Sequence, residues 1–184
     1  MSTKYKFHNP DGAYFVSFAI VNWYNLFTQE VYFNVLIDCV NYLRKHKGME
    51  LYAYCFMPNH VHMVFGSKTG EPSNLMRDFK GYTAKQLIEV VKGNPNDNRK
   101  DLIIGMFKKA GRFKSNIKNY QVWQHESHPI EVYSKKFVRQ KVNYIHKNPV
   151  VAGLCRFPED YIYSSARNYA EKQIVMEIDM MDSY

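Results

Sequence analysis

The sequence has little cysteine and no long hydrophobic run. Its three cysteines, Cys39, Cys55 and Cys155, are widely spaced, which excludes a disulfide framework and a CxxC metal knuckle. The longest apolar stretches are about as long as a strand, far short of the roughly 20 residues of a membrane-spanning helix. Residues 1–10 lack the apolar region of a signal peptide. These absences predict a soluble protein of the reducing cytoplasm, without a membrane partner.

Acidic residues are outnumbered by basic ones, and aromatic residues are plentiful. Lys and Arg total 25 against 17 Asp and Glu, which gives a formal net charge of +8. The chain also has 15 Tyr and 12 Phe. Because basic side chains bind phosphates and aromatic rings stack on bases, this composition favours single-stranded nucleic acid as a partner. Most of the rings are nevertheless expected in a hydrophobic core.

Hydrophobic periodicity predicts one α+β domain over residues 1–184, with residues 150–184 as a C-terminal extension. The expected strands are residues 13–21, 50–56, 60–65 and 121–125. The expected helices are residues 28–47, 72–91 and 131–147. Thr28 is the expected cap of the first, Gly48 its expected end, and Asn148-Pro149 the expected end of the last. This order matches the ferredoxin-like split βαβ plan, an antiparallel sheet with helices on one face.

Two other segments fit this plan less well. Residues 102–120 are basic and show no clear periodicity. Residues 174–180 alternate between apolar and polar side chains, as a strand does.

His60-Val61-His62 is the first motif with chemical content. On a strand, residues i and i+2 project from the same face, so both imidazoles point to one side of the sheet. Two imidazoles on one face can hold a divalent cation between them. The pair falls on an apolar strand after a tight turn at residues 57–59, whereas a chance pair is more common in a polar loop. We therefore expect a metal site here.

Tyr144 and Asn148 are the second motif. Four residues apart on a helix, they share one face. The amide oxygen of Asn148 is a hard ligand suited to Mg²⁺ or Mn²⁺, and the phenol of Tyr144 can act as a nucleophile. Taken alone, the two residues are more typical of packing and of a helix end, so this pattern leaves both interpretations open.

Two blocks of the sequence resemble one protein family. Residues 55–64, CFMPNHVHMV, are similar to the MPNHvHhv block of single-tyrosine HUH transposases. Residues 144–154, YIHKNPVVAGL, are similar to the YIHxNPVxAGL block of their REP-associated branch. Trp123-Gln124 and residues 158–166, PEDYIYSSA, are similar to further pieces of that branch. The resemblance covers roughly residues 13–169, with the blocks in the order of the family.

The resemblance implies an HUH nuclease fold and a metal-dependent single-strand DNA endonuclease and strand transferase, a transposase that acts on hairpin or palindromic DNA. It implies His60 and His62 as ligands of Mg²⁺ or Mn²⁺, and Asn148 as a third ligand. It implies Tyr144 as the nucleophile that forms a 5′-phosphotyrosine. No general base stands out, because His146 points off the face that Tyr144 occupies. We expect a monomer or homodimer in which Tyr144 acts within its own subunit.

Basic residues of the second expected helix and of the unassigned segment are the expected DNA contacts. Trp123 is a candidate for stacking on a base, with a place in the core as the alternative. The candidates are Lys80, Lys85, Lys108, Lys109, Arg112, Lys114 and Trp123.

Two other functions fit parts of the sequence. A replication or relaxase-type HUH nickase would use the same residues, but the chain is short and has no P-loop. A non-catalytic nucleic-acid-binding module would keep the fold, but the presence of both histidines, Tyr144 and Asn148 argues against it.

Overall fold

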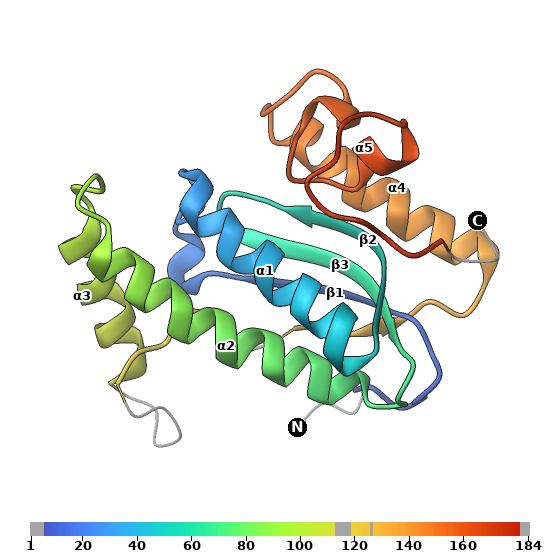
Figure 1. The fold of residues 1–184 in the computed structure, drawn as a ribbon, viewed down its shortest axis with the longest axis horizontal. Coiled ribbons are helices and arrows are strands. Elements are labelled where there is room, and N and C mark those ends of the chain that lie inside the picture. The colour runs from blue at the N-terminus through green and yellow to red at the C-terminus, as the bar shows by residue number, and fades with distance from the viewer. Residues whose placement is uncertain (1–5, 113–118, 126, 181–184) are drawn as a thin grey trace.

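The computed structural model describes residues 6–112, 119–125 and 127–180, and within them four strands form one antiparallel sheet (Figure 1). Along the sheet the strands follow the order β2-β3-β1-β4. They are β1 (Tyr14–Ala19), β2 (Met49–Phe56), β3 (His60–Ser67) and β4 (Ile130–Glu131). This order is that of a split βαβ sheet, so the predicted α+β, ferredoxin-like fold class is confirmed.

The helices cover both faces of the sheet, and the expectation of helices on one face is wrong for the last long helix. Helices α1 (Glu30–Lys47) and α2 (Pro72–Gly93) lie side by side across the near face in Figure 1. Helix α4 (Lys135–Val151) packs on the opposite face. The remaining elements are α3 (Lys100–Gly111), α5 (Ala166–Tyr169) and two 3₁₀ turns, η1 (Val21–Trp23) and η2 (Pro158–Asp160).

Two hydrophobic cores result, one on each face of the sheet. Val16 and Phe18 of β1 face the larger core under α1 and α2. Phe15, between them in sequence, faces the smaller core, where Val142 and Ile145 of α4 are buried. Because side chains alternate between the faces of a strand, a sheet covered on both faces needs apolar residues throughout. This explains why residues 13–21 read as one continuous apolar run.

The fourth strand lies later in the chain than predicted. Residues 121–125 form only an isolated bridge, between Trp123 and Ile20, and are not a strand. The edge strand is β4, where Ile130 pairs with Phe15 and Glu131 pairs with Tyr14. With two residues, β4 is too short to produce a recognisable alternation in the sequence.

The predicted helix ends were correct at Gly48 and wrong at three other positions. Gly48 ends α1 with φ 70°, a left-handed conformation that costs glycine little. Helix α1 is capped by Gln29 and not by Thr28. Helix α4 begins after Ser134, whose hydroxyl accepts from the Phe137 N–H, and not at residue 131. It also continues through Pro149 to Val151, because a proline removes one hydrogen bond but need not end the helix at that point.

The C-terminal extension packs on β2 and α4. The Ser165 N–H donates to the Tyr54 carbonyl at 2.9 Å, and the Phe56 N–H donates to the Tyr163 carbonyl at 2.9 Å. Residues 174–180 are not a strand, contrary to prediction, although the Leu51 N–H donates to the Asp179 carboxylate at 2.8 Å. The single domain with an extension from residue 150 stays a prediction. Among the described helices, none is long and apolar enough to span a membrane.

Candidate metal and nucleophile site

Strand β3 projects His60 and His62 toward the face that α4 covers. His62 lies opposite Ser17 on β1 and opposite Cys55 on β2, and His60 lies opposite Ala19. The centroids of the two imidazole rings are 4.6 Å apart. The structure thus brings the two histidines together on one face, as the strand period requires.

The imidazole of His62 is buried and lacks a hydrogen-bond partner of normal geometry among the described residues. Its side chain lies beneath the surface, and neither Nδ1 nor Nε2 makes a hydrogen bond of normal geometry to a described residue. Burial, assisted by the charge of nearby His60, lowers the pKa of His62 to about 3. The ring is therefore neutral at physiological pH, with a lone pair available to a ligand.

His60 is held by the residue before it. Its Nδ1 lies 2.6 Å from Asn59 Oδ1, so Nδ1 carries the proton when it donates to that oxygen. Nε2 is then the unprotonated nitrogen that can bind a cation, and the hydrogen bond to Asn59 fixes the orientation of the His60 ring. Burial lowers the pKa of His60, which also keeps this imidazole neutral.

Helix α4 places Tyr144 and Asn148 beside the histidines. The ring centroid of Tyr144 is 5.4 Å from that of His62, and the tyrosine is 51% exposed. The side chain of Asn148 lies near enough to both imidazoles to oppose part of the fall in their pKa values. All four predicted site residues therefore meet within one chain, and the phenol is open to solvent.

These residues fit a divalent cation. The main support for a bound cation is that both nitrogens of buried His62 lack a hydrogen-bond partner among the described residues. A buried polar atom without a partner costs folding free energy, and a metal ligand bond would offset that cost. Two neutral imidazoles and an amide oxygen suit a transition metal or Mg²⁺ with open coordination positions. The described residues contain no cluster of three His, Cys, Asp or Glu, and the side chain nearest to completing the pair of imidazoles with an oxygen is the Asn148 amide.

Phe15 and Lys141 belong to the site and were not foreseen from the sequence. The Phe15 ring stacks on His62 at 5.8 Å and meets the Tyr144 ring edge-on at 5.9 Å. Lys141 Nζ lies 4.7 Å from the centroid of the Phe15 ring, and its charge helps to lower the pKa of His62. Lys141 precedes Tyr144 by three residues, a helical spacing that would have revealed the shared face.

Other polar residues of the segments that resemble the family have structural contacts. His146 Nε2 is 2.8 Å from Ser165 Oγ, and burial lowers the pKa of His146 to about 4. The Tyr161 hydroxyl donates to the Phe56 carbonyl at 2.8 Å, and burial raises the pKa of that phenol. These bonds attach the C-terminal extension to α4 and β2, and they leave Tyr144 as the accessible phenol beside the histidines.

Two of the DNA-contact candidates are parts of the fold. Trp123 is 4% exposed and donates from Nε1 to Thr83 Oγ1 at 2.9 Å, so the prediction that its ring stacks on a base is wrong. Lys80 Nζ donates to the Gln124 carbonyl at 2.7 Å and to Ser127 Oγ at 3.1 Å, and burial lowers its pKa to about 8. Lys80 thereby holds the segment that precedes β4.

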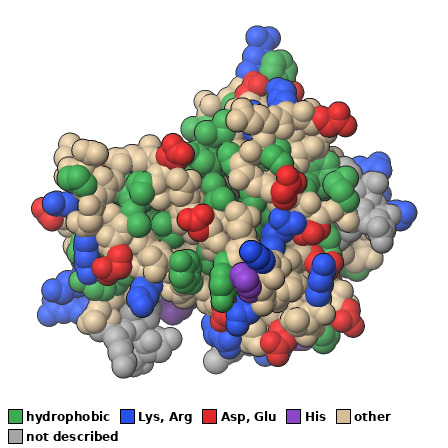
Figure 2. Space-filling view, viewed as in Figure 1, with side chains coloured by type: hydrophobic (Ala, Val, Ile, Leu, Met, Phe, Trp, Pro, Cys, Tyr) green, Lys and Arg blue, Asp and Glu red, His purple; other side chains and the backbone are tan. Residues whose placement is uncertain are grey.

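The other basic candidates lie away from the histidines. Lys85 is exposed on α2, and Lys108, Lys109 and Arg112 are exposed at the end of α3. Helix α3 packs on α2 at the opposite end of the molecule from α4 (Figure 1). Lys114 lies outside the described residues. On the face drawn in Figure 2, Lys and Arg side chains are interspersed with Asp and Glu, so the positive charge is not gathered there.

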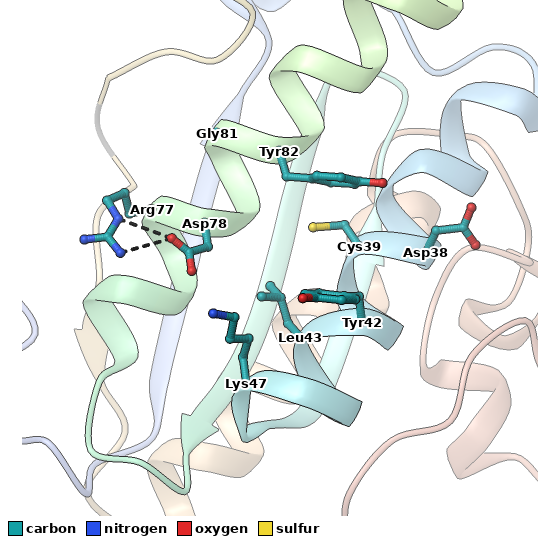
Figure 3. Close-up of a pocket in the computed structure, with 9 residues that line it drawn as sticks. All are labelled: Asp38, Cys39, Tyr42, Leu43, Lys47, Arg77, Asp78, Gly81 and Tyr82. Atoms are coloured by element: carbon teal, nitrogen blue, oxygen red, sulfur yellow. Dashed lines mark hydrogen bonds and ion pairs between the residues drawn. The ribbon is translucent and has the colours of Figure 1, made fainter.

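A separate hollow of about 830 Å³ opens between α1 and α2 (Figure 3). Tyr42 and Tyr82 stand on opposite sides of it, with Cys39 between them. Burial raises the pKa of the Cys39 thiol to about 12, which makes it a poor nucleophile. The hollow lies on the α1 and α2 side of the sheet, and its lining includes neither His62 nor Tyr144. It is therefore not part of the histidine and tyrosine site.

Fold and site together define a class of protein, a ferredoxin-like domain with two histidines on one strand and a tyrosine on the covering helix. Residues 13–102, which include His60 and His62, match the family described as "Transposase IS200 like". The match covers just under half of the chain, and it confirms the resemblance to IS200-like transposases that the sequence shows.

One solved structure extends the similarity of fold to nearly the whole chain. A structure described as a REP-associated tyrosine transposase bound to a REP hairpin matches with a TM-score of 0.66 and 19% sequence identity, covering 99% of this chain and 94% of that one. A structure from Deinococcus radiodurans R1, described only provisionally as a transposase, matches with a TM-score of 0.44 and 17% identity, covering 74% of this chain and 90% of that one. No curated protein matches the sequence.

Proposed function

We propose that this chain is a metal-dependent single-strand DNA endonuclease and strand transferase that uses Tyr144 as its nucleophile. The observation that carries the proposal is the row of rings from His60 through His62 to Tyr144, with centroid steps of 4.6 and 5.4 Å. His62, in the middle of this row, is buried and neutral, whereas the tyrosine end is open to solvent. The match of residues 13–102 to a transposase family supports the same function.

The chain's own residues perform a transesterification. The Tyr144 oxygen attacks the scissile phosphorus, and the bond from phosphorus to the 3′-oxygen breaks. The phenol loses its proton to solvent, and the departing 3′-oxygen takes up a proton, so the exchange is balanced. One phosphodiester replaces another, and a free 3′-hydroxyl can later attack the 5′-phosphotyrosine to rejoin the strand.

His60, His62 and Asn148 hold the cation, Mg²⁺ or Mn²⁺. When bound, such an ion supplies Lewis-acid polarisation of the phosphate oxygens. Asn59 fixes the tautomer of His60, and Phe15 fixes the ring of His62 by stacking on it. Lys141 adds a positive charge on the same face of α4 as Tyr144, where the phosphate would lie.

The substrate we propose is single-stranded or hairpin DNA, reached in the cytoplasm by a monomer or homodimer. The net charge of +8 suits a polyanion. The solved structure with the same fold is that of a protein bound to a REP hairpin. A non-catalytic binding module is disfavoured, because it has no need of a buried imidazole such as that of His62, which lacks a hydrogen-bond partner among the described residues.

Trapping of the covalent adduct tests the proposal. Wild-type protein mixed with hairpin DNA labelled on either side of the cleaved bond should retain only the fragment with the 5′-phosphate, in a form that survives denaturation. Peptide mapping should place it on Tyr144. Tyr144→Phe keeps the ring and should lose the adduct, while its free energy of unfolding changes by less than about 0.5 kcal/mol, because the hydroxyl is on the surface.

Tyr133→Phe is the matched control, since Tyr133 is also exposed and lies just before α4. It should form the adduct at the wild-type rate. An adduct that persists in Tyr144→Phe, or that maps to another tyrosine, would show that the nucleophile is wrongly assigned.

A further inference from the structure

Trp23 is a large exposed ring beside the proposed metal site. Its side chain is 57% exposed, although tryptophan is usually well buried. Its ring centroid lies 5.7 Å from that of His60, in an edge-on contact. The indole therefore stands at the solvent edge of the same group of rings that contains His62 and Tyr144.

The backbone holds this indole at an energetic cost. Trp23 has φ 54° and Asn22 before it has φ 58°, in the left-handed region that a bulky residue rarely occupies. Asn59 Nδ2 donates to the Trp23 carbonyl at 3.1 Å, while the other end of that amide contacts His60. The same side chain thus holds both the backbone of Trp23 and the imidazole of His60.

The loop that carries Trp23 is anchored from a third element. The Arg99 guanidinium donates to the Asn25 carbonyl at 3.2 Å and to Thr28 Oγ1 at 2.7 Å. An ion pair with buried Asp97, at 2.8 Å, holds Arg99 in turn. Trp23 is therefore exposed on a braced loop, which is what a preorganised binding surface requires.

We infer that Trp23 is a base-stacking platform, and that it binds the nucleobase next to the scissile phosphate of single-stranded DNA. The inference rests on the proposed function, since it takes the strand to pass from Tyr144 over the two histidines. Centroid steps of 5.4, 4.6 and 5.7 Å join Tyr144, His62, His60 and Trp23 into one row with an exposed ring at each end. Stacking on an indole is tolerant of sequence, because every base has a π-face.

Tryptophan fluorescence tests the inference directly, because the chain has only two tryptophans and the other, Trp123, is buried. Titration of the wild-type protein with a short oligothymidylate should quench the emission of the exposed indole. An abasic oligonucleotide with the same number of phosphates should bind without this quenching. In Trp23→Phe, the remaining emission from Trp123 should stay constant during the titration.

Affinity gives the second measurement. Trp23→Ala should weaken binding of the oligothymidylate by about tenfold to a hundredfold, and Trp23→Phe should weaken it less, since a smaller ring remains. Tyr42→Ala removes an equally exposed ring on the opposite side of the sheet and should bind as the wild type does. Melting temperatures of all variants would be measured in the same buffer.

The outcomes separate this inference from the proposed function. Unchanged indole emission at saturating oligothymidylate, or a Trp23→Ala variant that binds as tightly as Tyr42→Ala, would overturn the stacking role alone. If the wild-type protein bound no single-stranded DNA at all, the proposed function would fail and the stacking role with it. Equal quenching by the abasic oligonucleotide would show that phosphates, not bases, approach Trp23.

Discussion

At the scale of the residue, the buried imidazole of His62 offers the sharpest test of the proposed metal dependence. Both its nitrogens lack a protein partner, and its neighbour His60 already has one nitrogen bound to Asn59. We predict that His62→Ala removes tight binding of Mn²⁺, measured by calorimetry, and that cleavage falls by at least about 100-fold. Chelation with EDTA should abolish cleavage by the wild-type protein.

His46→Ala is the matched control for His62→Ala. His46 is an exposed histidine on α1, and among the ring contacts of the described residues its imidazole contacts Tyr42. It should leave both metal binding and cleavage unchanged. Full cleavage by His60→Ala/His62→Ala in EDTA would contradict a metal site at this pair.

At the scale of the element, α4 decides whether the site is complete in one chain. The Tyr144 ring lies beside His62 of the same chain, and α4 is attached to β2 through His146 and Ser165. We predict that mixing Tyr144→Phe with His60→Ala protein restores no cleavage. Appearance of adduct in the mixture, followed on denaturing gels, would mean that α4 is exchanged between two chains.

The turn between α2 and α3 is the second element with a testable role. Asp97 accepts from the Tyr32 hydroxyl at 2.7 Å and pairs with Arg99, which holds the pKa of the Asp97 carboxyl well below its usual range. The folded state therefore prefers the ionised carboxylate of Asp97. The contribution of this carboxylate to the free energy of unfolding is complete above about pH 4 and is lost as pH falls below that value. Asp97→Asn should therefore lower the free energy of unfolding by about 2–4 kcal/mol at pH 7.

Urea denaturation at several pH values would measure this difference. The gap between wild type and Asp97→Asn should stay constant from pH 7 to about pH 5 and narrow only below about pH 4. Asp78→Asn breaks an exposed pair with Arg77 and should cost no more than about 1 kcal/mol. A gap that widened on acidification would contradict the role of the Asp97 carboxylate.

At the scale of the whole molecule, the proposed function predicts that charge and shape govern which DNA is bound. The scissile backbone has to reach a tyrosine on the sheet face covered by α4, so an unpaired strand or a hairpin should bind more tightly than a plain duplex. The logarithm of the binding constant should fall linearly with the logarithm of salt concentration, with a slope of about −0.7 for each phosphate neutralised. Equal affinity for duplex and hairpin across salt concentrations, measured by fluorescence anisotropy, would argue against this mode of binding.

The sequence by itself determined the first three strands of the sheet and the chemical pairs. The period of two on β3 put both histidines on one face, and the spacing of four put Tyr144 and Asn148 on one face of a helix. Gly48 ended α1 as expected, since its conformation depends on local sterics alone. These features could be predicted because each depends on residues close together in the chain.

Only the tertiary structure decided which faces meet. Helix α4 crosses to the far side of the sheet, so that Phe15 and Lys141 join the site although neither belongs to a motif. The same packing buries Trp123 and leaves Trp23 exposed beside His60, and two tryptophans with the same chemistry thereby have opposite environments. Burial and contact between distant segments arise from the whole packed chain, and local periodicity does not contain that information.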